Sequence, residues 1–280
     1  MIAALLALAL AAPGIEVTVA ARSIRPGELV VLTLTLDEQA SGVTVRAFGG
    51  PVPVYRLRAG VWQALVGIDL DRKPGTYAVA VEAHVGPMVI RGEQMLAVKP
   101  RTFATRTLRV EPEFVNPPEA LLARIQSEAD FIREVTARSG ADRLWSEPFV
   151  RPVREPANSR FGTRSVFNGE ARRPHGGADF LSPEGTPVRA PNAGRVAAAR
   201  DLFFTGNTVI IDHGMGVVSL LAHLSAMDVR EGDVITAGQV IGRVGATGRV
   251  TGPHLHWGVT VLGSRVDPLS VLALIGQTSK

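Results

Sequence analysis

The chain has 280 residues, of which 46% are hydrophobic and 20% charged, so its composition excludes a disordered protein and leaves room for two ordinary domains. The formal net charge of +4, without a Lys or Arg block, indicates a mildly basic surface that suits an acidic polymer and equally an ordinary Arg-rich surface. Cysteine is absent, which excludes disulfides, Cys-bound zinc and thiol nucleophiles, so any metal must be held by His, Asp or Glu.

An apolar run opens the chain. Its residues, MIAALLALALAA, are too few to span a bilayer and end in small residues before Pro13, as in the hydrophobic region of a secretory signal. The basic residues that usually precede such a region are missing, and a buried first strand or helix is the alternative. We expect residues 1–12 to be a signal peptide, the protein to be exported to the periplasm or cell envelope, and no segment to span a membrane stably.

Residues 14–112 show the pattern of short, half-buried strands. Apolar side chains such as Val30, Leu32 and Leu34 occupy every second position, and turns that contain Pro and Gly separate the runs. This spacing predicts a small Ig-like β-sandwich. Its one histidine, His84, stands alone, so we expect an accessory domain without catalytic chemistry.

A helix is predicted next. Apolar residues recur at helical spacing from Leu121 to Val135, after two prolines and after Asn116, which can cap the helix. Gly140 is expected to end it. Residues 113–147 are therefore predicted to be a helical linker between two β-rich parts.

Glycine-punctuated strands return in residues 148–273. Apolar runs at 208–211, 217–221, 240–244 and 255–261 predict an antiparallel β-sheet domain, so the whole chain is expected to be mainly β with little helix.

One segment of this domain, VREGDVITAGQVIGRVG (229–245), is similar to the hairpins of biotinyl and lipoyl carrier domains. Those carriers are modified on a Lys, and no Lys occurs between Pro100 and Lys280. The similarity therefore predicts a barrel-sandwich-like topology without the carrier function.

Two histidines lie one residue apart in TGPHLHWGV (251–259). On a strand, His254 and His256 project from the same face, with Leu255 behind them, and two neighbouring imidazoles can bind a cation. Taken alone, the pair fits two structural histidines at a strand end as well.

A second segment, RRPHGGADF, places His175 and Asp179 on either side of two glycines. The glycines allow the backbone to turn so that an imidazole and a carboxylate converge on one point. A third segment, LLAHLS, contributes His223, although a lone histidine in an apolar run is more often a core residue bonded to a carbonyl.

The three segments together contain four of the six histidines of the chain and one aspartate. This is the ligand chemistry of a zinc site without thiolates. Three protein ligands with one open position are typical of catalytic zinc, because water and the substrate carbonyl bind there, whereas a structural zinc is closed.

The runs SRFGTRSVFNGEARRPHGGADF, GNTVIIDHGMGVVSLLAHLS and VGATGRVTGPHLHWGV follow one another in this order. They closely resemble the LytM-type (lysostaphin-like, M23) family of zinc metallopeptidases, and the resemblance covers residues 148–270. Through the segment FVNPPEALLARI, the sandwich and the helix are similar to the accessory region of exported bacterial members.

By their places in these motifs, the resemblance implies that His175, Asp179 and His256 bind one Zn²⁺ per chain. It implies that His223 and His254 are catalytic histidines that do not bind the metal, and it leaves open which of them accepts and which donates a proton. The implied function is that of an exported zinc endopeptidase acting on peptide cross-links of bacterial peptidoglycan, without a nucleic-acid partner.

The chain departs from the family pattern at Leu221. The family usually has Tyr at this position, two residues before His223, so a hydroxyl that could assist the site is absent. We expect an effect on rate or substrate preference and none on metal binding.

Several other residues near the motifs have structural or substrate-binding interpretations. Asn207 and His213 match the family pattern and are expected to be structural or to line the groove. Arg160 and Arg164 are candidates for contacts with substrate carboxylates, and Trp257 is expected in the core.

The alternative function is a non-catalytic LytM-like wall-binding protein or an activator of other wall hydrolases, since some members of the fold have lost metal ligands. The complete ligand set favours the enzyme. A regulatory protein partner that moves the accessory domain away from the groove is a further hypothesis.

Overall fold

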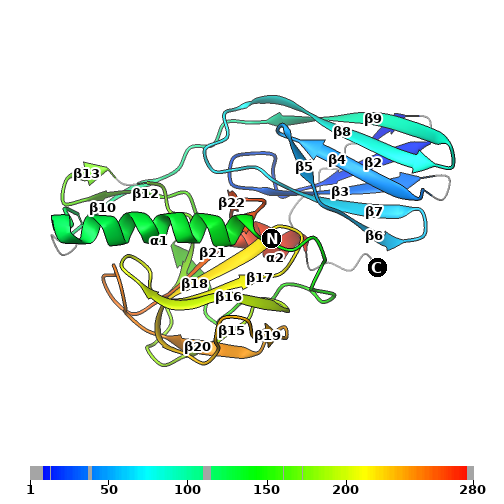
Figure 1. Cartoon of the computed structure of the whole chain (residues 1–280). Helices are drawn as coiled ribbons and strands as arrows, with labels where there is room; N and C mark the ends of the chain where they lie inside the picture. Colours follow the sequence, from blue (N-terminus) through cyan, green and yellow to red (C-terminus); the bar gives the residue numbers. More distant parts are fainter. Residues whose placement is uncertain are drawn as a thin grey trace.

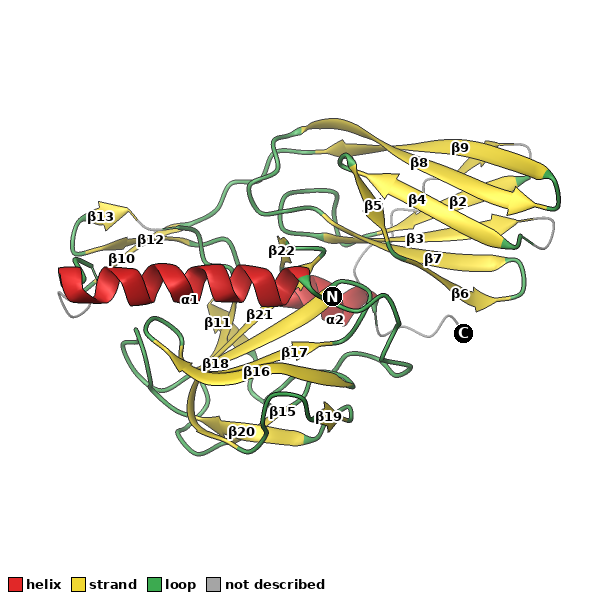
Figure 2. Ribbon diagram, in the orientation of Figure 1, coloured by secondary structure: helices red, strands yellow, loops and turns green. Residues whose placement is uncertain are grey.

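The computed structural model describes residues 9–12, 14–36, 40–109, 115–159, 161–171 and 173–275. The prediction of a mainly β protein is confirmed, because these residues form many short strands and two helices, α1 (Glu119–Ala137) and α2 (Pro268–Leu274). The N-terminal strands form one body and the C-terminal strands another, and α1 runs along the side of the second body (Figure 1 and Figure 2).

The N-terminal body consists of two antiparallel sheets. The first has the order β1 (Ala9–Ala12), β2 (Ile15–Ala20), β3 (Leu29–Leu36), β7 (Val61–Gly67) and β6 (Val54–Arg58). The second has the order β5 (Gly50–Val52), β4 (Gly42–Ala47), β8 (Gly75–Val85) and β9 (Met88–Val98).

The core between these sheets follows from the alternation in the sequence. Val30, Leu32 and Leu34 of β3 point inward and pack against residues such as Val79 and Val81 of β8. Successive side chains of a strand point to opposite faces, so every second residue enters the core. The predicted half-buried strands are thus present, and the lone His84 lies exposed on the surface.

The C-terminal body is built on a larger antiparallel sheet. Its order is β11 (Ala157–Ser159), β14 (Gly177–Phe180), β21 (Leu255–Val261), β18 (Val217–Met227), β17 (Gly206–Asp212), β16 (Gly194–Leu202) and β19 (Val234–Ile235). β20 (Val240–Val244) pairs with β18 and with β15 (Pro187–Arg189), and β22 (Ser264–Val266) pairs with β21. The four apolar runs expected to be strands lie in β17, β18, β20 and β21.

A small third sheet joins the two parts of the chain. β10 (Thr105–Leu108) runs parallel to β12 (Arg164–Phe167), which pairs with β13 (Glu170–Ala171). The accessory domain was expected to extend to residue 112, whereas the sandwich strands end at Val98 and β10 pairs with the C-terminal body.

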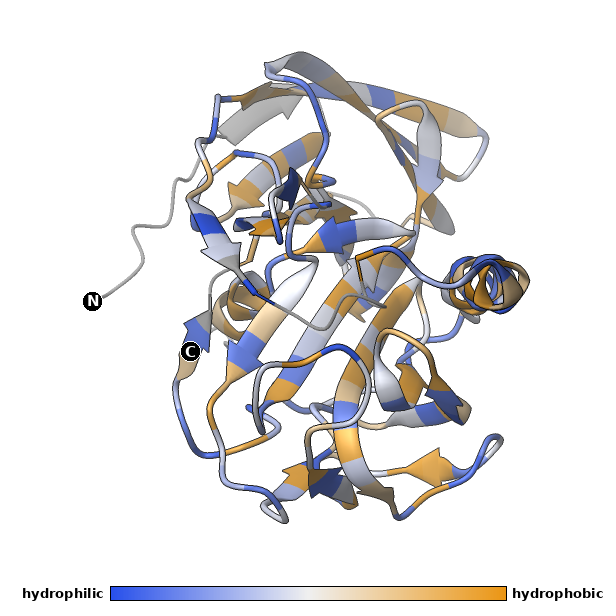
Figure 3. Ribbon diagram, turned by 90° about the vertical axis from the view of Figure 1, so that its left-hand side faces the viewer, coloured by the Kyte–Doolittle hydropathy of each residue, from blue (hydrophilic) through white to orange (hydrophobic). Residues whose placement is uncertain are grey.

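Helix α1 lies on the large sheet. Phe131, Ile132 and Val135 pack on a small cluster that includes Ile210 and Val218, although no residue of the helix is fully buried. Figure 3, in which α1 is seen nearly end-on, shows the helix standing beside the sheet. The segment expected to be a linker therefore covers part of the C-terminal body.

The predicted start of α1 was wrong. The N-cap residue is Pro118, and no side chain caps the helix by a hydrogen bond, so Asn116 does not have the expected role. The helix begins at Glu119, two residues later than a cap at Asn116 requires, so the Asn116 side chain precedes the position from which a capping group accepts.

The sandwich and the C-terminal body share a hydrophobic core. Leu29, Val31 and Leu65 point away from the sandwich interior and belong to the same buried cluster as Trp257 and Val261. They are between 0% and 6% exposed. β3 is consequently buried on both faces, which the expectation of half-buried strands did not include.

A buried ion network fixes the edge of this interface. Glu28 receives hydrogen bonds from Arg22 and Arg101, at 2.9 Å and 3.1 Å from Oε1, and Arg22 also binds Asp267 at 2.6 Å. The side chain of Glu28 is only 5% exposed. Because Asp267 caps α2 by accepting from the Leu269 amide, the network links the sandwich to the last helix.

The predicted signal segment lies only partly within the described chain. Residues 1–8 are outside the described residues, and Ala9–Ala12 form β1, which pairs antiparallel with Ile15–Thr18. The signal peptide stays a prediction. Neither described helix combines the length and apolar character that crossing a membrane requires.

His213 is a structural histidine at the end of the β17–β18 hairpin. It is 0% exposed, its Nδ1–H donates to the Ala193 carbonyl at 2.8 Å, and its Nε2 accepts from the Ser219 hydroxyl at 2.9 Å. Ser219 in turn accepts from the Trp257 indole. Burial lowers the pKa of His213 to about 4, so the ring is neutral at pH 7.

Removing one partner from the ion network is expected to destabilise the protein. Glu28→Gln leaves Arg22 and Arg101 partly buried without their carboxylate, and we expect the free energy of unfolding to fall by about 2–3 kcal/mol. Urea denaturation of the full chain measures this, with the exposed Glu93→Gln as the matched control. Equal stabilities of the two variants would contradict the proposed importance of the network.

The buried neutral His213 predicts a pH dependence of stability. Between its unfolded pKa of 6.5 and its folded pKa of about 4, the unfolded state binds a proton that the folded state does not, so stability falls as pH is lowered. This contribution reaches about 3 kcal/mol near pH 4. His213→Asn should be less stable at pH 7 but lose less stability between pH 6.5 and 4, as measured by urea denaturation. Parallel pH profiles of the two proteins would show that His213 does not titrate in this way.

Candidate metal centre

The pairing of two central strands creates the candidate site. β14 and β21 are antiparallel, and their register places Asp179 directly opposite His256. Residues directly opposite in an antiparallel pair have neighbouring side chains on one face. The sheet thus holds a carboxylate and an imidazole side by side. Most residues of β14 and β21 are buried.

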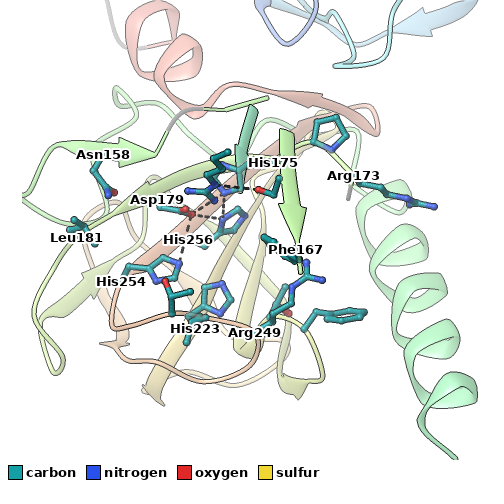
Figure 4. Close-up of a pocket in the computed structure, with 18 residues that line it drawn as sticks. Asn158, Phe167, Arg173, His175, Asp179, Leu181, His223, Arg249, His254 and His256 are labelled. Atoms are coloured by element: carbon teal, nitrogen blue, oxygen red, sulfur yellow. Dashed lines mark hydrogen bonds and ion pairs between the residues drawn. The ribbon is translucent and has the colours of Figure 1, made fainter. Parts of the chain in front are cut away.

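His175 completes the group from the loop that precedes β14. Its Nε2 lies 2.9 Å from Asp179 Oδ1 and 3.0 Å from His256 Nδ1, and the latter two atoms are also 2.9 Å apart. The three residues predicted as ligands therefore form a compact triangle, and Figure 4 shows their side chains pointing toward one another.

Of the two glycines between His175 and Asp179, Gly177 is needed for a reason other than the predicted one. A Cβ at Gly177 would lie 2.4 Å from the Trp257 carbonyl oxygen and 2.7 Å from the His256 ring. Neither Gly176 nor Gly177 has a positive φ. Gly177 therefore makes room for the imidazole of His256, and a turn does not require it.

The chemistry of the donor set fits a zinc ion. Each of the three atoms can offer a lone pair. Three hydrogen bonds would need one hydrogen for each edge of the triangle, whereas two neutral imidazoles supply at most two and a carboxylate supplies none. A cation at the centre uses all three lone pairs. Ligand atoms around a tetrahedral zinc lie about 3.3 Å apart, close to the spacing of this triangle.

The electrostatics of the triangle favour the deprotonated forms of Asp179 and His256. Burial alone would raise the pKa of Asp179, but hydrogen bonds and charge interactions with His175 and His256 hold it well below its usual range. Burial lowers the pKa of His256, an effect that the hydrogen bond to Asp179 partly offsets. A carboxylate and a neutral imidazole are the protonation states that a metal requires.

His223 stands beside the triangle on a bulge of β18. Its φ of +65° is uncommon for a residue other than glycine, and the pairing of β18 with β17 shifts register at this point. Its Nδ1–H donates to the Thr247 carbonyl at 2.9 Å, which leaves Nε2 as the acceptor of the neutral ring. Burial, together with the nearby His256 and His254, lowers the pKa of His223 to about 3.

His254 is the second imidazole outside the triangle. Its Nδ1–H donates to the Gly252 carbonyl at 2.9 Å, and its Nε2 lies 3.9 Å from Asp179 Oδ1. The ring centroids of His223 and His254 are 4.8 Å apart. The five site residues predicted from sequence are therefore brought together, three in the triangle and two next to it.

Residues that the sequence did not single out line the remaining cavity. It has a volume of about 370 Å³ and is walled by cationic and apolar side chains, namely Arg106, Arg173, Arg249, Phe167, Phe204 and Leu181. Arg249 lies over the rings of Phe167 and Phe204. Arg173 and Arg249 belong to the quoted motifs and were visible in the sequence, whereas Arg106 reaches the cavity only because β10 pairs with β12.

The other residues considered in the sequence lie elsewhere. Leu221 is fully buried in the core and does not line the cavity. A side chain at this position therefore does not reach the metal site, and the absence of a Tyr hydroxyl here removes no group from the cavity lining. Trp257 is also 0% exposed, as expected. Arg164 is exposed and does not line the cavity, and Arg160 lies outside the described residues.

Asn207 supports the site from outside. Its amide nitrogen donates to the Leu224 carbonyl, and its backbone N–H donates to Thr247 Oγ1. Because Thr247 also provides the carbonyl that orients His223, Asn207 has the structural role that was one of its two predicted interpretations.

Comparison with known proteins agrees with this geometry. Residues 173–268 match Peptidase family M23. Over 114 residues the chain is 48% identical to the DD-carboxypeptidase/endopeptidase Mpg of Neisseria meningitidis serogroup B, covering 41% of this chain and 26% of that protein. Over 96 residues it is 44% identical to the peptidoglycan DD-endopeptidase ShyA of Vibrio cholerae, covering 34% and 22%. The chain thus spans about a quarter of the length of these curated relatives.

A solved structure extends the likeness to the accessory region. A crystal structure assigned to peptidase M23, from Pseudomonas aeruginosa, is 34% identical, covers 90% of this chain and 96% of its own, and superposes with a TM-score of 0.70. M23 peptidases are zinc-dependent, and His175, Asp179 and His256 are the group that could hold the ion. The chain belongs to peptidase family M23.

Proposed function

We propose that this protein is a zinc endopeptidase that hydrolyses peptide cross-links of bacterial peptidoglycan. The observation that carries the proposal is the triangle of His175, Asp179 and His256, with His223 and His254 beside it, all five in the lining of one cavity. A structural zinc site would be closed by a fourth protein ligand, whereas this group opens into the cavity.

The residues around the triangle support a hydrolytic mechanism. A zinc ion bound by the three ligands would supply a Lewis acid that polarises the scissile carbonyl and makes water a better nucleophile near neutral pH. In both His223 and His254, Nδ1–H donates a hydrogen bond to a backbone carbonyl. Nε2 is therefore the free acceptor of each neutral ring, and both rings line the cavity. Nε2 of a neutral imidazole can accept a proton from water and return it to the leaving amine.

His223 and His254 lie close enough to each other to act in the same proton-transfer step. The ring centroids of His223 and His254 are 4.8 Å apart, so the two imidazoles stand next to each other beside the triangle. Two neighbouring imidazoles can divide the two proton transfers that hydrolysis requires, one from water and one to the leaving amine. The strained backbone of His223 is consistent with this role, because strain is often retained at functional positions.

The substrate class is supported by the relatives and by charge. ShyA is named a peptidoglycan DD-endopeptidase, and Mpg a DD-carboxypeptidase/endopeptidase. Three arginines line the cavity against a single carboxylate, Asp179, which fits a substrate that carries free carboxylates. Such a substrate lies outside the cytoplasm, which agrees with the predicted export to the periplasm or cell envelope.

The test combines metal content with digestion of purified cross-linked muropeptides. We expect about one zinc per wild-type chain and release of uncross-linked peptides. His175→Ala should lose most of the metal and the activity. His223→Ala and His254→Ala should keep the metal and lose about 10²–10⁴-fold in kcat, the usual contribution of a general acid or base.

The exposed His84→Ala provides the matched control and should behave as wild type. A wild-type protein that binds no zinc would overturn the proposal. A protein that binds zinc but leaves muropeptides intact would favour the non-catalytic, wall-binding alternative.

A further inference from the structure

A second hollow lies next to the metal centre, between α1 and the face of the sheet. It has a volume of about 740 Å³. Its wall on the helix side consists of Ala129, Ile132, Arg133 and Thr136, and its floor consists of outward-facing residues of β18 and β21, namely Val218, Leu220, Gly258 and Thr260. The floor is the same sheet face that carries His256.

The hollow and the metal cavity adjoin. Five residues line both of them: Arg173, Pro174, Gly176, Thr205 and His256. A peptide bound with its scissile bond at the triangle would therefore have the hollow beside it, along β21 and beneath α1.

Arg173 occupies the junction of the two spaces. Figure 4 shows its side chain directed toward α1, on the far side of the triangle from His223 and His254. Two other arginines of the hollow have carboxylate partners: Arg265 binds Asp69 and Asp71, and Arg133 binds Asp130. Within the described part of the chain, Arg173 is exposed and has no such partner.

We propose that the hollow beneath α1 is part of the substrate site, and that Arg173 binds a carboxylate on the arm of the peptide that enters it. This inference rests on the proposed function and deepens it. A planar guanidinium binds a carboxylate through two parallel hydrogen bonds, so the contact would select both the charge and the orientation of that arm.

Helix α1 forms one wall of this subsite. None of its side chains is fully buried, so the helix is held beside the sheet by a narrow strip of contacts and by polar anchors at both ends. Near its start Arg124 binds Asp201, and just beyond its end Ser139 and Gly140 bind Asp212. The hollow is the space that remains between the helix, next to this strip of contacts, and the face of β18 and β21.

The first test measures kinetics on two muropeptides that differ only in their carboxylates. One carries free carboxylates and the other has them amidated. Arg173→Gln should reduce kcat/KM about ten- to a hundredfold on the first substrate, mainly through KM, and leave the second nearly unchanged. The control is Arg164→Gln, an exposed arginine that lines neither space. Equal losses on both substrates, or no loss, would overturn the assignment of Arg173.

The second test fills the hollow. Ala129→Trp places a large side chain in it from an exposed helical position, whereas Ala123→Trp makes the same change at an exposed position that does not line it. We expect Ala129→Trp to lower kcat/KM about tenfold or more on the cross-linked substrate and much less on a short peptide that lacks the second arm. Unchanged kinetics in both variants would exclude the hollow from the site.

Failure of the proposed function can be told apart from failure of this inference. If the wild-type protein cleaves no muropeptide, the same labelled pair is used in fluorescence anisotropy binding measurements. Tighter binding of the free-carboxylate form, lost in Arg173→Gln and kept in Arg164→Gln, supports the inference without catalysis. Equal binding of both forms by the wild type overturns it.

Discussion

The antiparallel register of β14 and β21 is the constraint on which the site depends. It places Asp179 across from His256, and Gly177 leaves the space that the His256 ring occupies. A shift by one residue would turn these side chains to the opposite face of the sheet, into the core around Phe180 and Trp257. The buried apolar residues on that face therefore fix the metal ligands as firmly as they fix the fold.

The parts of the chain before the peptidase sheet contribute to the site indirectly. β10 brings Arg106 to the cavity, and α1 provides a wall of the adjoining hollow. No described residue of the sandwich strands lines the metal cavity. The sandwich instead packs against the elements that carry the ligands, through Leu29, Val31 and Leu65. The sandwich therefore supports the large sheet on the side of Trp257, the face opposite the metal ligands.

Much of the fold and of the ligand set could be predicted because the signals are local. Alternation of apolar residues identifies strands, and motifs such as RRPHGGADF contain their own ligands. The contribution of Arg106 depends on a parallel pairing with a strand far along the chain, which no local pattern encodes. The double-sided burial of β3 did leave a signal, since LVVLTLTL begins with apolar residues in both phases of the alternation. The position of α1 could not be inferred, because helical spacing indicates an apolar face and not its partner.

The shared core has a consequence for the evolution and engineering of this protein. A peptidase domain that shares its core with a neighbouring domain cannot be expressed alone without cost. Removing the sandwich would expose the apolar surface that packs against Leu29 and Leu65, and it would also remove the ion network at Glu28. Recombination that joined this domain to a different module would have to supply a matching apolar strand face. The sandwich and the peptidase are therefore expected to be inherited together as one unit.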